Sequence, residues 1–142
     1  MSVITGGSLN AQQARLAALT VKISGLRDGR GCLRVALFDH AGGFPNDSAR
    51  AVAHREVPLA RQAPLNPTLV TFDGLPPGRY AVSVLHDRSG TGRMEMDFLG
   101  RPKDEWGVSN NPHPLFRAPH FSEAEIKVEP QETKTVMIVL RR

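Results

Sequence analysis

Apolar and polar residues alternate along most of this chain with a period of two, which is typical of β-strands that bury one face. The alternation covers seven ranges: 19–23, 33–37, 56–59, 69–72, 80–85, 124–128 and 136–140. Pro58 restricts the third range to the edge of a sheet, because proline has no N–H to donate to a neighbouring strand. The pattern therefore predicts seven strands.

Short links rich in turn residues join most of these strands, and only residues 49–55 and the segment before Leu19 have helical leanings. This arrangement favours an all-β fold, an antiparallel seven-stranded β-sandwich of the immunoglobulin-like or transthyretin-like kind with one long ordered loop. A chain of 142 residues suits one domain. We predict a flexible N-terminal tail over residues 1–18 and a single β-sandwich domain over residues 19–142.

One link has a specific turn signature, the sequence LPPGRY at residues 75–80. Pro77 can preset φ at the second position of a type II turn, and Gly78 can take the positive φ that the third position requires. The turn would deliver Tyr80 into the next strand with its ring on the same face as Val82 and Val84. Sandwich domains of the transthyretin-like type show a similar pattern.

Composition removes several classes of protein. The chain is 40% apolar, so it can bury a core and is not wholly disordered. No stretch approaches 18 consecutive apolar residues, which excludes a membrane-spanning helix. Gly and Pro together supply 24 residues, whereas the chain has only 8 aromatic residues, including one Trp and one Tyr.

The net charge of +4 invites the hypothesis of nucleic-acid binding, which needs clustered cations. The basic residues are instead spread from Arg15 to Arg142, and no short window contains five of them. We therefore predict no nucleic-acid partner. Cys32 is the single cysteine, which excludes an internal disulfide. It lies in an apolar run and is predicted to be a small buried residue.

The connection from His86 to Phe121 is exceptional, because its 36 residues contain no convincing strand or helix. Loops of this length are usually functional or disordered. Four of the eight aromatic residues lie within it (Phe98, Trp106, Phe116 and Phe121), whereas disordered linkers lack aromatic residues. We therefore expect this loop to fold onto the sandwich. Trp106 could be a stacking face for a ligand or, by default, a lid that closes the core.

The start of this loop has the oxygen spacing of a calcium-binding loop. With Asp87 as position 1, side-chain oxygens fall at positions 3, 5 and 9, and Gly92 stands at position 6. Position 12 is Phe98, so the usual bidentate carboxylate is missing. The candidate ligands for Ca²⁺ are Asp87, Ser89, Thr91, Glu95 and Asp97. The alternative is a turn-rich loop whose side chains cap its own backbone amides.

Two acid–base pairs stand at predicted strand ends, Asp39 with His40 and His86 with Asp87. If these ends met, they could support a hydrolase or a metal-dependent enzyme. No serine or cysteine in a nucleophile setting accompanies them, so the enzyme remains the alternative hypothesis and we expect no catalytic residues.

Several short motifs occur in a fixed order along the chain. They are GLR at 25–27, VALF at 35–38, FP at 44–45, LPPGRYAV at 75–82, HD at 86–87, FLGRP at 98–102, WGVSNN at 106–111 and FSEA at 121–124. This series resembles the bacterial family catalogued as domain of unknown function 2141, over about residues 19–140. The resemblance implies a small β-sandwich protein without assigned chemistry, usually exported. Members of that family commonly carry an Asn- and Gly-rich stretch like a calcium loop after the His-Asp pair, where this chain has RSGTG.

These observations lead to one functional hypothesis, an exported accessory module whose long loop recognises a small ligand or another envelope protein. The loop would be ordered internally and by a cation such as Ca²⁺. The residues expected to shape the ligand site are His86, Trp106, Asn110 and Asn111. The resemblance implies a periplasmic or secreted location. Residues 1–18 do not have the pattern of a signal peptide, which leaves a cytoplasmic location or a removed leader as alternatives.

Overall fold

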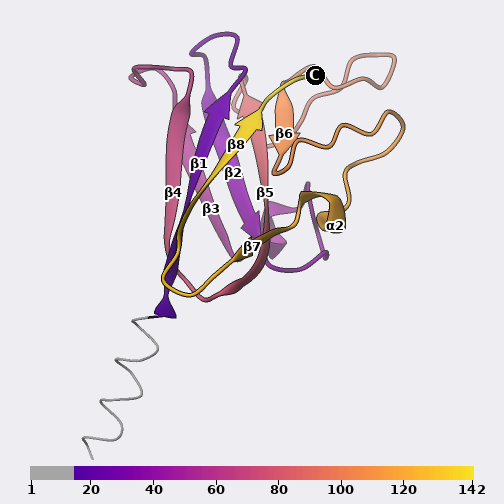
Figure 1. The fold of residues 1–142 in the computed structure, drawn as a ribbon. Coiled ribbons are helices and arrows are strands. Elements are labelled where there is room, and N and C mark those ends of the chain that lie inside the picture. The colour runs from indigo at the N-terminus through magenta and orange to yellow at the C-terminus, as the bar shows by residue number, and fades with distance from the viewer. Residues whose placement is uncertain (1–14) are drawn as a thin grey trace, which may run out of the picture.

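Two β-sheets face each other in the computed structural model, which describes residues 15–142 (Figure 1). Sheet A has the strand order β4-β1-β8 and sheet B has the order β3-β2-β5-β6, with β7 paired to the start of β5. The strands are β1 (Ala17–Ser24), β2 (Cys32–Phe38), β3 (Ala53–Pro58), β4 (Thr68–Leu75), β5 (Gly78–Asp87), β6 (Trp106–Val108), β7 (Ile126–Val128) and β8 (Thr133–Val139). The short helices are η1 (Ser48–Arg50) and α2 (Phe121–Ala124). The all-β prediction is confirmed.

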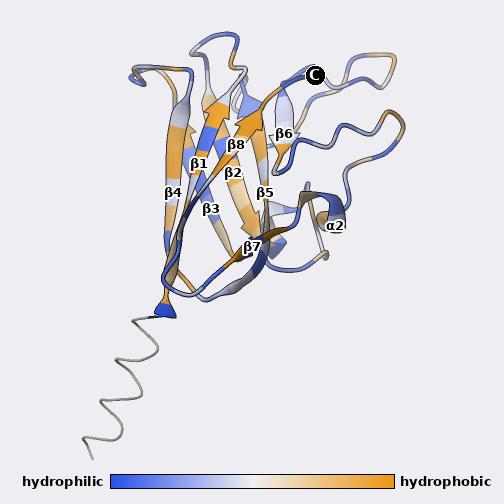
Figure 2. Cartoon of the chain, in the orientation of Figure 1, coloured by the Kyte–Doolittle hydropathy of each residue, from blue (hydrophilic) through white to orange (hydrophobic). Residues whose placement is uncertain are grey.

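The core lies between the two sheets, where the apolar faces of the strands meet (Figure 2). In β1, Leu19, Val21 and Ile23 are fully buried, while the residues between them point outward. The buried residues of β2 and β5 complete the same cluster, so the period of two in the sequence marks the core. Cys32 is buried, as expected of a small apolar residue.

The strand arrangement differs from the prediction in three respects. β1 and β8 pair in parallel, so the sandwich is not wholly antiparallel. β6 is an eighth strand, three residues long, inside the segment predicted to be loop. Ala124, predicted to begin a strand, ends helix α2 instead. The predicted tail falls mostly outside the described residues, and its last two residues belong to β1, which begins at Ala17.

The turn between β4 and β5 also corrects an expectation. Gly78 does not adopt a positive φ, whereas Gly74 does, at +66°. The left-handed residue thus lies four positions earlier than the sequence suggested. Tyr80 is nevertheless buried with Val82 and Val84 as predicted, and its hydroxyl donates a hydrogen bond to the carbonyl of Pro76 at 2.6 Å.

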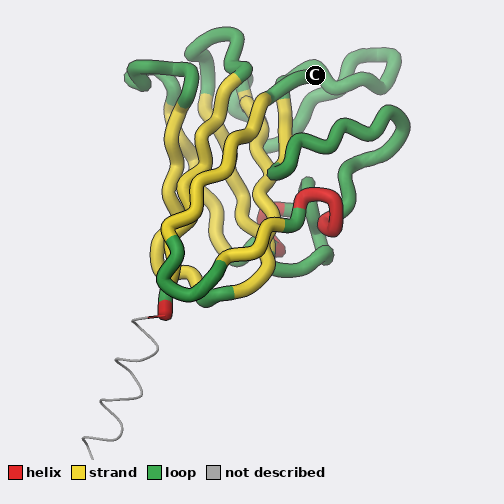
Figure 3. Tube along the Cα trace, viewed as in Figure 1, coloured by secondary structure: helices red, strands yellow, loops and turns green. Residues whose placement is uncertain are grey.

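The long loop forms two projections from the same side of the sandwich, separated by β6 (Figure 3). We call residues 94–102 the first arm and residues 113–119 the second arm. Two backbone hydrogen bonds close the first arm, from the Asp97 amide to the Arg101 carbonyl and from the Lys103 amide to the Glu95 carbonyl, both 2.8 Å. Large apolar side chains at the tips of both arms, Phe98 and Leu99 in the first and Leu115 and Phe116 in the second, are exposed to solvent.

The aromatic residues of the loop therefore divide into two pairs. Trp106 and Phe121 pack against a small second cluster formed by Ala81, Val108 and Ala124. Phe98 and Phe116 lie in the arms and are 94% and 96% exposed. The expectation that the loop folds onto the sandwich is correct for the first pair and wrong for the second. Within residues 15–142, no helix is both long enough and apolar enough to cross a membrane.

Candidate functional site

A cleft of about 710 Å³ lies between the two arms. Met96 and Pro102 contribute from the first arm, Leu115 and Phe116 from the second, and Trp106 of β6 from between them. The lining is mixed, because polar and charged side chains such as Asn46, Asp97 and Arg101 also contribute to it. A volume of this size lies in the range of ligand-binding sites.

Trp106 is held in place by His113, whose ring stacks on the indole at 5.4 Å between centroids and 25° between planes. The indole N–H is buried and has no hydrogen-bond partner in the described chain. A buried donor without a partner costs free energy, because it has lost its hydrogen bonds to water. A ligand that offered an acceptor here would remove that cost.

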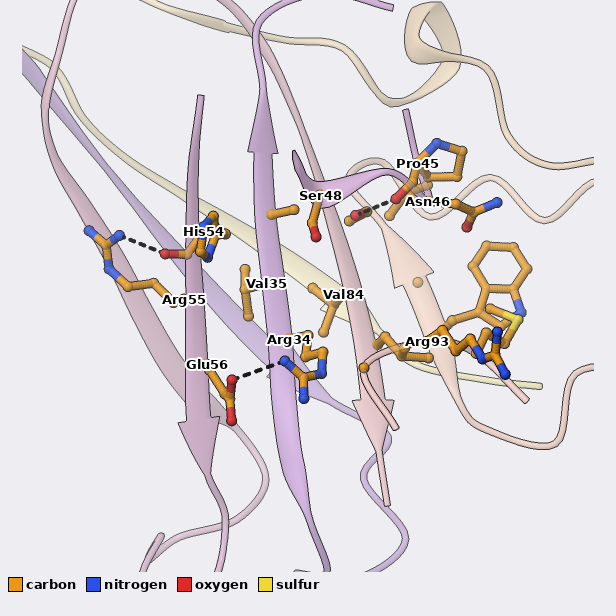
Figure 4. Close-up of a pocket in the computed structure, with 18 residues that line it drawn as sticks. Arg34, Val35, Pro45, Asn46, Ser48, His54, Arg55, Glu56, Val84 and Arg93 are labelled. Carbon is orange, nitrogen blue, oxygen red and sulfur yellow. Dashed lines mark hydrogen bonds and ion pairs between the residues drawn. The ribbon is translucent and has the colours of Figure 1, made fainter. Parts of the chain in front are cut away.

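A second, smaller cavity of about 210 Å³ lies on the outer face of sheet B (Figure 4). Its small side chains include Ala36 and Ser83, and Arg34 and Arg93 also line it. Figure 4 shows the Arg34 side chain turned toward Glu56. The two cavities share four lining residues: Pro45, Asn46, Met94 and Trp106. They are therefore adjacent, and we refer to both together as the groove.

Most charged side chains along the groove are paired. Arg34 donates to Asp87 at 2.7 Å and to Glu56 at 2.9 Å, and Arg101 donates to Asp97 at 3.0 Å. In the second arm, Arg117 donates to both carboxylate oxygens of Glu123, at 2.7 and 3.1 Å. The Arg117 guanidinium and the backbone amide of His120 lower the pKa of Glu123 to about 2, so this pair is ionised near neutral pH.

The candidate calcium ligand Asp87 is occupied by hydrogen-bond donors. Its carboxylate accepts from Arg34 and from the backbone amides of Gly90, Thr91 and Gly92, at 2.7 to 3.1 Å. Burial raises the pKa of Asp87, but the hydrogen bonds from Arg34 and the amides outweigh it, and the net pKa lies below the ordinary 3.8. Asp87 therefore organises the start of the loop as an ionised carboxylate.

The other candidate calcium ligands make similar local contacts. Ser89 donates to Glu95, and Thr91 donates to the Arg93 carbonyl at 3.0 Å. Asp97 caps the amides at the tip of the first arm. Among residues 15–142, no group of three or more His, Cys, Asp or Glu side chains is placed to hold a metal ion. These contacts follow the alternative that the sequence left open, side chains that cap their own loop.

His86 is completely buried beside a residue that the sequence did not single out, Glu105. The Nε2 of His86 lies 2.7 Å from the Arg30 carbonyl, so Nε2 carries the proton and donates it. Its Nδ1 lies 3.9 Å from Glu105 and has no hydrogen-bond partner in the described residues. His86 does not line the groove, and its contacts join the β1–β2 turn to the segment before β6.

The two acid–base pairs of the enzyme hypothesis do not converge. In the antiparallel pairing of β2 with β5, Cys32 is opposite Asp87 and Phe38 is opposite Ala81. Asp39 and His40 follow Phe38, so the two pairs lie at opposite ends of these strands. At a rise of about 3.3 Å per residue, roughly 20 Å separates them.

Asn110 and Asn111 fix the loop rather than face the groove. Both have positive φ, 66° and 54°. Asn110 donates to the carbonyls of Glu123 and Glu125. The Asn111 side chain accepts from the Val139 amide at 2.9 Å and donates to the Met137 carbonyl at 3.1 Å, so it covers part of the edge of β8.

Replacing Asn111 by alanine should lower the free energy of unfolding by about 1–3 kcal/mol, because the variant loses two hydrogen bonds and forces alanine into the left-handed region. Glycine adopts the left-handed conformation without strain, so Asn111→Gly should recover only the part of the lost stability that comes from backbone strain. Urea unfolding of the three proteins measures both contributions. Equal stability of the two variants would show that strain plays no part.

Sequence reasoning singled out none of the arginines or methionines that line the groove, among them Met94, Arg93 and Arg142. Periodicity could not find them, because their position depends on how the two arms and β6 meet. The one available signal was the concentration of aromatic residues in the loop, which led to Trp106.

A comparison with protein families gives a match over residues 21–136 to a family described as "Uncharacterized protein conserved in bacteria (DUF2141)". The match covers most of the chain, including every strand from β2 to β7. No curated protein and no solved structure matches the chain.

Proposed function

The chain belongs to the bacterial DUF2141 family, and from that premise we propose that it is a non-catalytic binding module whose groove takes up a ligand. In this proposal the two sheets are a rigid frame of immunoglobulin-like or transthyretin-like kind, and the two arms recognise the ligand. The proposal places the protein in the bacterial envelope, in line with the exported location that the family resemblance implies.

The observation that carries the proposal is the cleft of about 710 Å³ beside Trp106. Trp, Met and Arg are enriched in recognition surfaces, and all three line this cleft. The buried indole N–H offers an unused donor, and the exposed Phe98 and Phe116 add apolar area to the arms. Large exposed apolar side chains that gather in one region indicate an interaction site.

The chain contains a single tryptophan, so the fluorescence of Trp106 reports directly on the cleft. Anilinonaphthalene sulfonate, a planar aromatic anion, should bind one site with a dissociation constant of about 1–100 μM and quench Trp106. Trp106→Ala should weaken binding at least about tenfold, followed by the probe's own emission, because stacking surface is lost.

The matched control is Leu69→Ser, which removes an exposed apolar side chain from β4 on the other sheet. This variant should bind the probe as the wild type does. The proposal fails if the probe does not bind, or if Trp106→Ala and Leu69→Ser have the same effect. Circular dichroism of the unliganded variants shows that both remain folded.

A further inference from the structure

We infer that the groove recognises an acidic, extended segment of a partner protein that carries apolar anchor residues. This inference rests on the proposed function and names its ligand class. The juxtaposition that carries it is a cleft with exposed apolar side chains adjacent to a second cavity, with an unpaired arginine in each.

The charge along the groove is positive after pairing is considered. The two cavities contain six arginines (Arg34, Arg55, Arg93, Arg101, Arg117 and Arg142) and two carboxylates (Glu56 and Asp97). Arg34, Arg101 and Arg117 are neutralised by the acidic partners described above. Arg55 lies over the ring of Phe72, 4.8 Å from its centroid.

Of the six arginines, Arg93 and Arg142 are the two that have no partner described above. Within residues 15–142, neither guanidinium makes an ion pair or a hydrogen bond. Arg93 lines the cavity on sheet B and Arg142 lines the cleft between the arms, and Trp106 borders both cavities. Two unpaired cations in adjacent cavities that share one aromatic residue complement a ligand that carries carboxylates at intervals along its length.

The apolar part of the lining favours a polypeptide over a sugar or a small anion. Met94, Met96, Leu115 and Phe116 offer flexible, non-polar surface that suits leucine or phenylalanine side chains. Flexible, methionine-rich surfaces adapt to different peptide side chains. A saccharide would instead require a dense set of free hydrogen-bonding side chains, whereas Arg101 and Asp97 bond to each other and Arg117 bonds to Glu123.

The shape of the groove favours an extended segment. The cavity of about 210 Å³ on sheet B and the cleft of about 710 Å³ adjoin at Trp106, so a bound chain would pass this residue from one to the other. An extended chain places successive side chains on opposite sides. Apolar anchors could therefore enter the cleft while alternate carboxylates reach the two arginines.

The test uses two synthetic ten-residue peptides that differ only in charge. One alternates glutamate with phenylalanine and leucine, and the other has lysine in place of glutamate. Neither contains tryptophan, so the fluorescence of Trp106 follows binding to the full chain. The acidic peptide should bind at least about tenfold more tightly, and its affinity should fall as salt rises from about 0.1 M to about 1 M.

The double variant Arg93→Ala, Arg142→Ala should weaken binding of the acidic peptide about tenfold and abolish its salt dependence. Arg61→Ala is the matched control, because Arg61 is an exposed arginine in the β3–β4 connection away from the groove, and it should bind as the wild type does. Phe116→Ala, which alters an exposed side chain of the second arm, should weaken both peptides.

Equal affinity for the two peptides would overturn the inference. So would tighter binding of polygalacturonate or of phosphatidylglycerol vesicles, measured by competition with the acidic peptide. If anilinonaphthalene sulfonate binds at Trp106 and neither peptide does, the inference fails and the proposed binding function stands. If neither the probe nor the peptides bind, both fail.

Discussion

Replacing Asp87 by alanine should lower the free energy of unfolding by about 3 kcal/mol, because the change removes a buried carboxylate that pairs with the partly exposed Arg34 and accepts hydrogen bonds from three loop amides. The Asp87 side chain is 0% exposed, and it accepts hydrogen bonds from Arg34 and from three loop amides. Alanine would leave all four donors without their acceptor. Urea unfolding measures the loss, and trypsin cleavage after Arg88 and Arg93 should become faster.

Two further variants test whether the loss of stability is specific to the Asp87 carboxylate or would follow from any substitution at the end of a strand. Asp87→Asn keeps the volume and one acceptor oxygen, so it should lose less than alanine does. Asp39→Ala removes an aspartate that also follows a strand, but its side chain is 47% exposed and, among residues 15–142, its one ion pair is with His40 at 3.7 Å. That change should cost less than about 0.5 kcal/mol. A similar loss in Asp39→Ala and Asp87→Ala would contradict the role given to the loop amides.

The difference in stability between the wild type and Asp87→Ala should depend on pH. Burial raises the pKa of Asp87, the hydrogen bonds from Arg34 and the loop amides lower it by more, and the net pKa in the folded protein is below the ordinary 3.8. The unfolded chain therefore takes up this proton first as the pH falls. The stability that Asp87 contributes is complete above about pH 3.8 and is lost below it, as the pH falls through the folded pKa. The difference between wild type and Asp87→Ala should shrink over that acidic range.

The strands could be predicted because burial of one face imposes a period of two on the sequence. In β1, the inward positions Leu19, Val21 and Ile23 alternate without interruption. The same alternation does not say which strand lies beside β1 or in which direction it runs. The parallel pairing with β8 depends on the connection after β7, which leads the chain from a strand paired with β5 to sheet A.

β6 escaped prediction because three residues are too few to show a period. Its central residue, Gly107, is required by packing, since an added Cβ would lie 2.9 Å from Cγ2 of Ile138. A glycine in a strand often marks such a close approach. In the sequence alone, the same glycine looks like a turn.

The candidate calcium loop shows a different limit of prediction from sequence. Side-chain oxygens at alternate positions serve equally well for a cation or for capping backbone amides, so the spacing of Asp87, Ser89 and Thr91 does not choose between them. What distinguishes the two uses is Arg34, which stands 53 positions earlier and donates to Asp87 across the sheet. Such a long-range charge is invisible to local pattern analysis. The groove is likewise a product of tertiary structure, because its parts come from β2, β5, β6 and both arms.

Replacing Gly31 by alanine should prevent the β1–β2 turn from packing against the end of β5. Gly31 has a φ of +67°, and an added Cβ would lie 2.1 Å from the Asp87 carbonyl oxygen and 2.7 Å from Cα of Arg88. Both atoms belong to the backbone and cannot rotate away. The left-handed conformation costs alanine about 1–2 kcal/mol, and relief of the overlap adds about 1–3 kcal/mol or more. We expect a total loss of at least about 2 kcal/mol, measured by urea unfolding.

Gly74→Ala is the control that isolates the overlap. Gly74 has almost the same φ, +66°, but nothing lies within 4 Å of the added Cβ. It should therefore lose only the backbone contribution of about 1–2 kcal/mol. The difference between the two variants measures how tightly the turn at Gly31 is held against Asp87, where the Arg30 carbonyl also accepts a hydrogen bond from His86. An equal loss in both variants would show that the turn at Gly31 can move away from the Asp87 backbone without cost. The turn would then not anchor the loop that begins at Asp87.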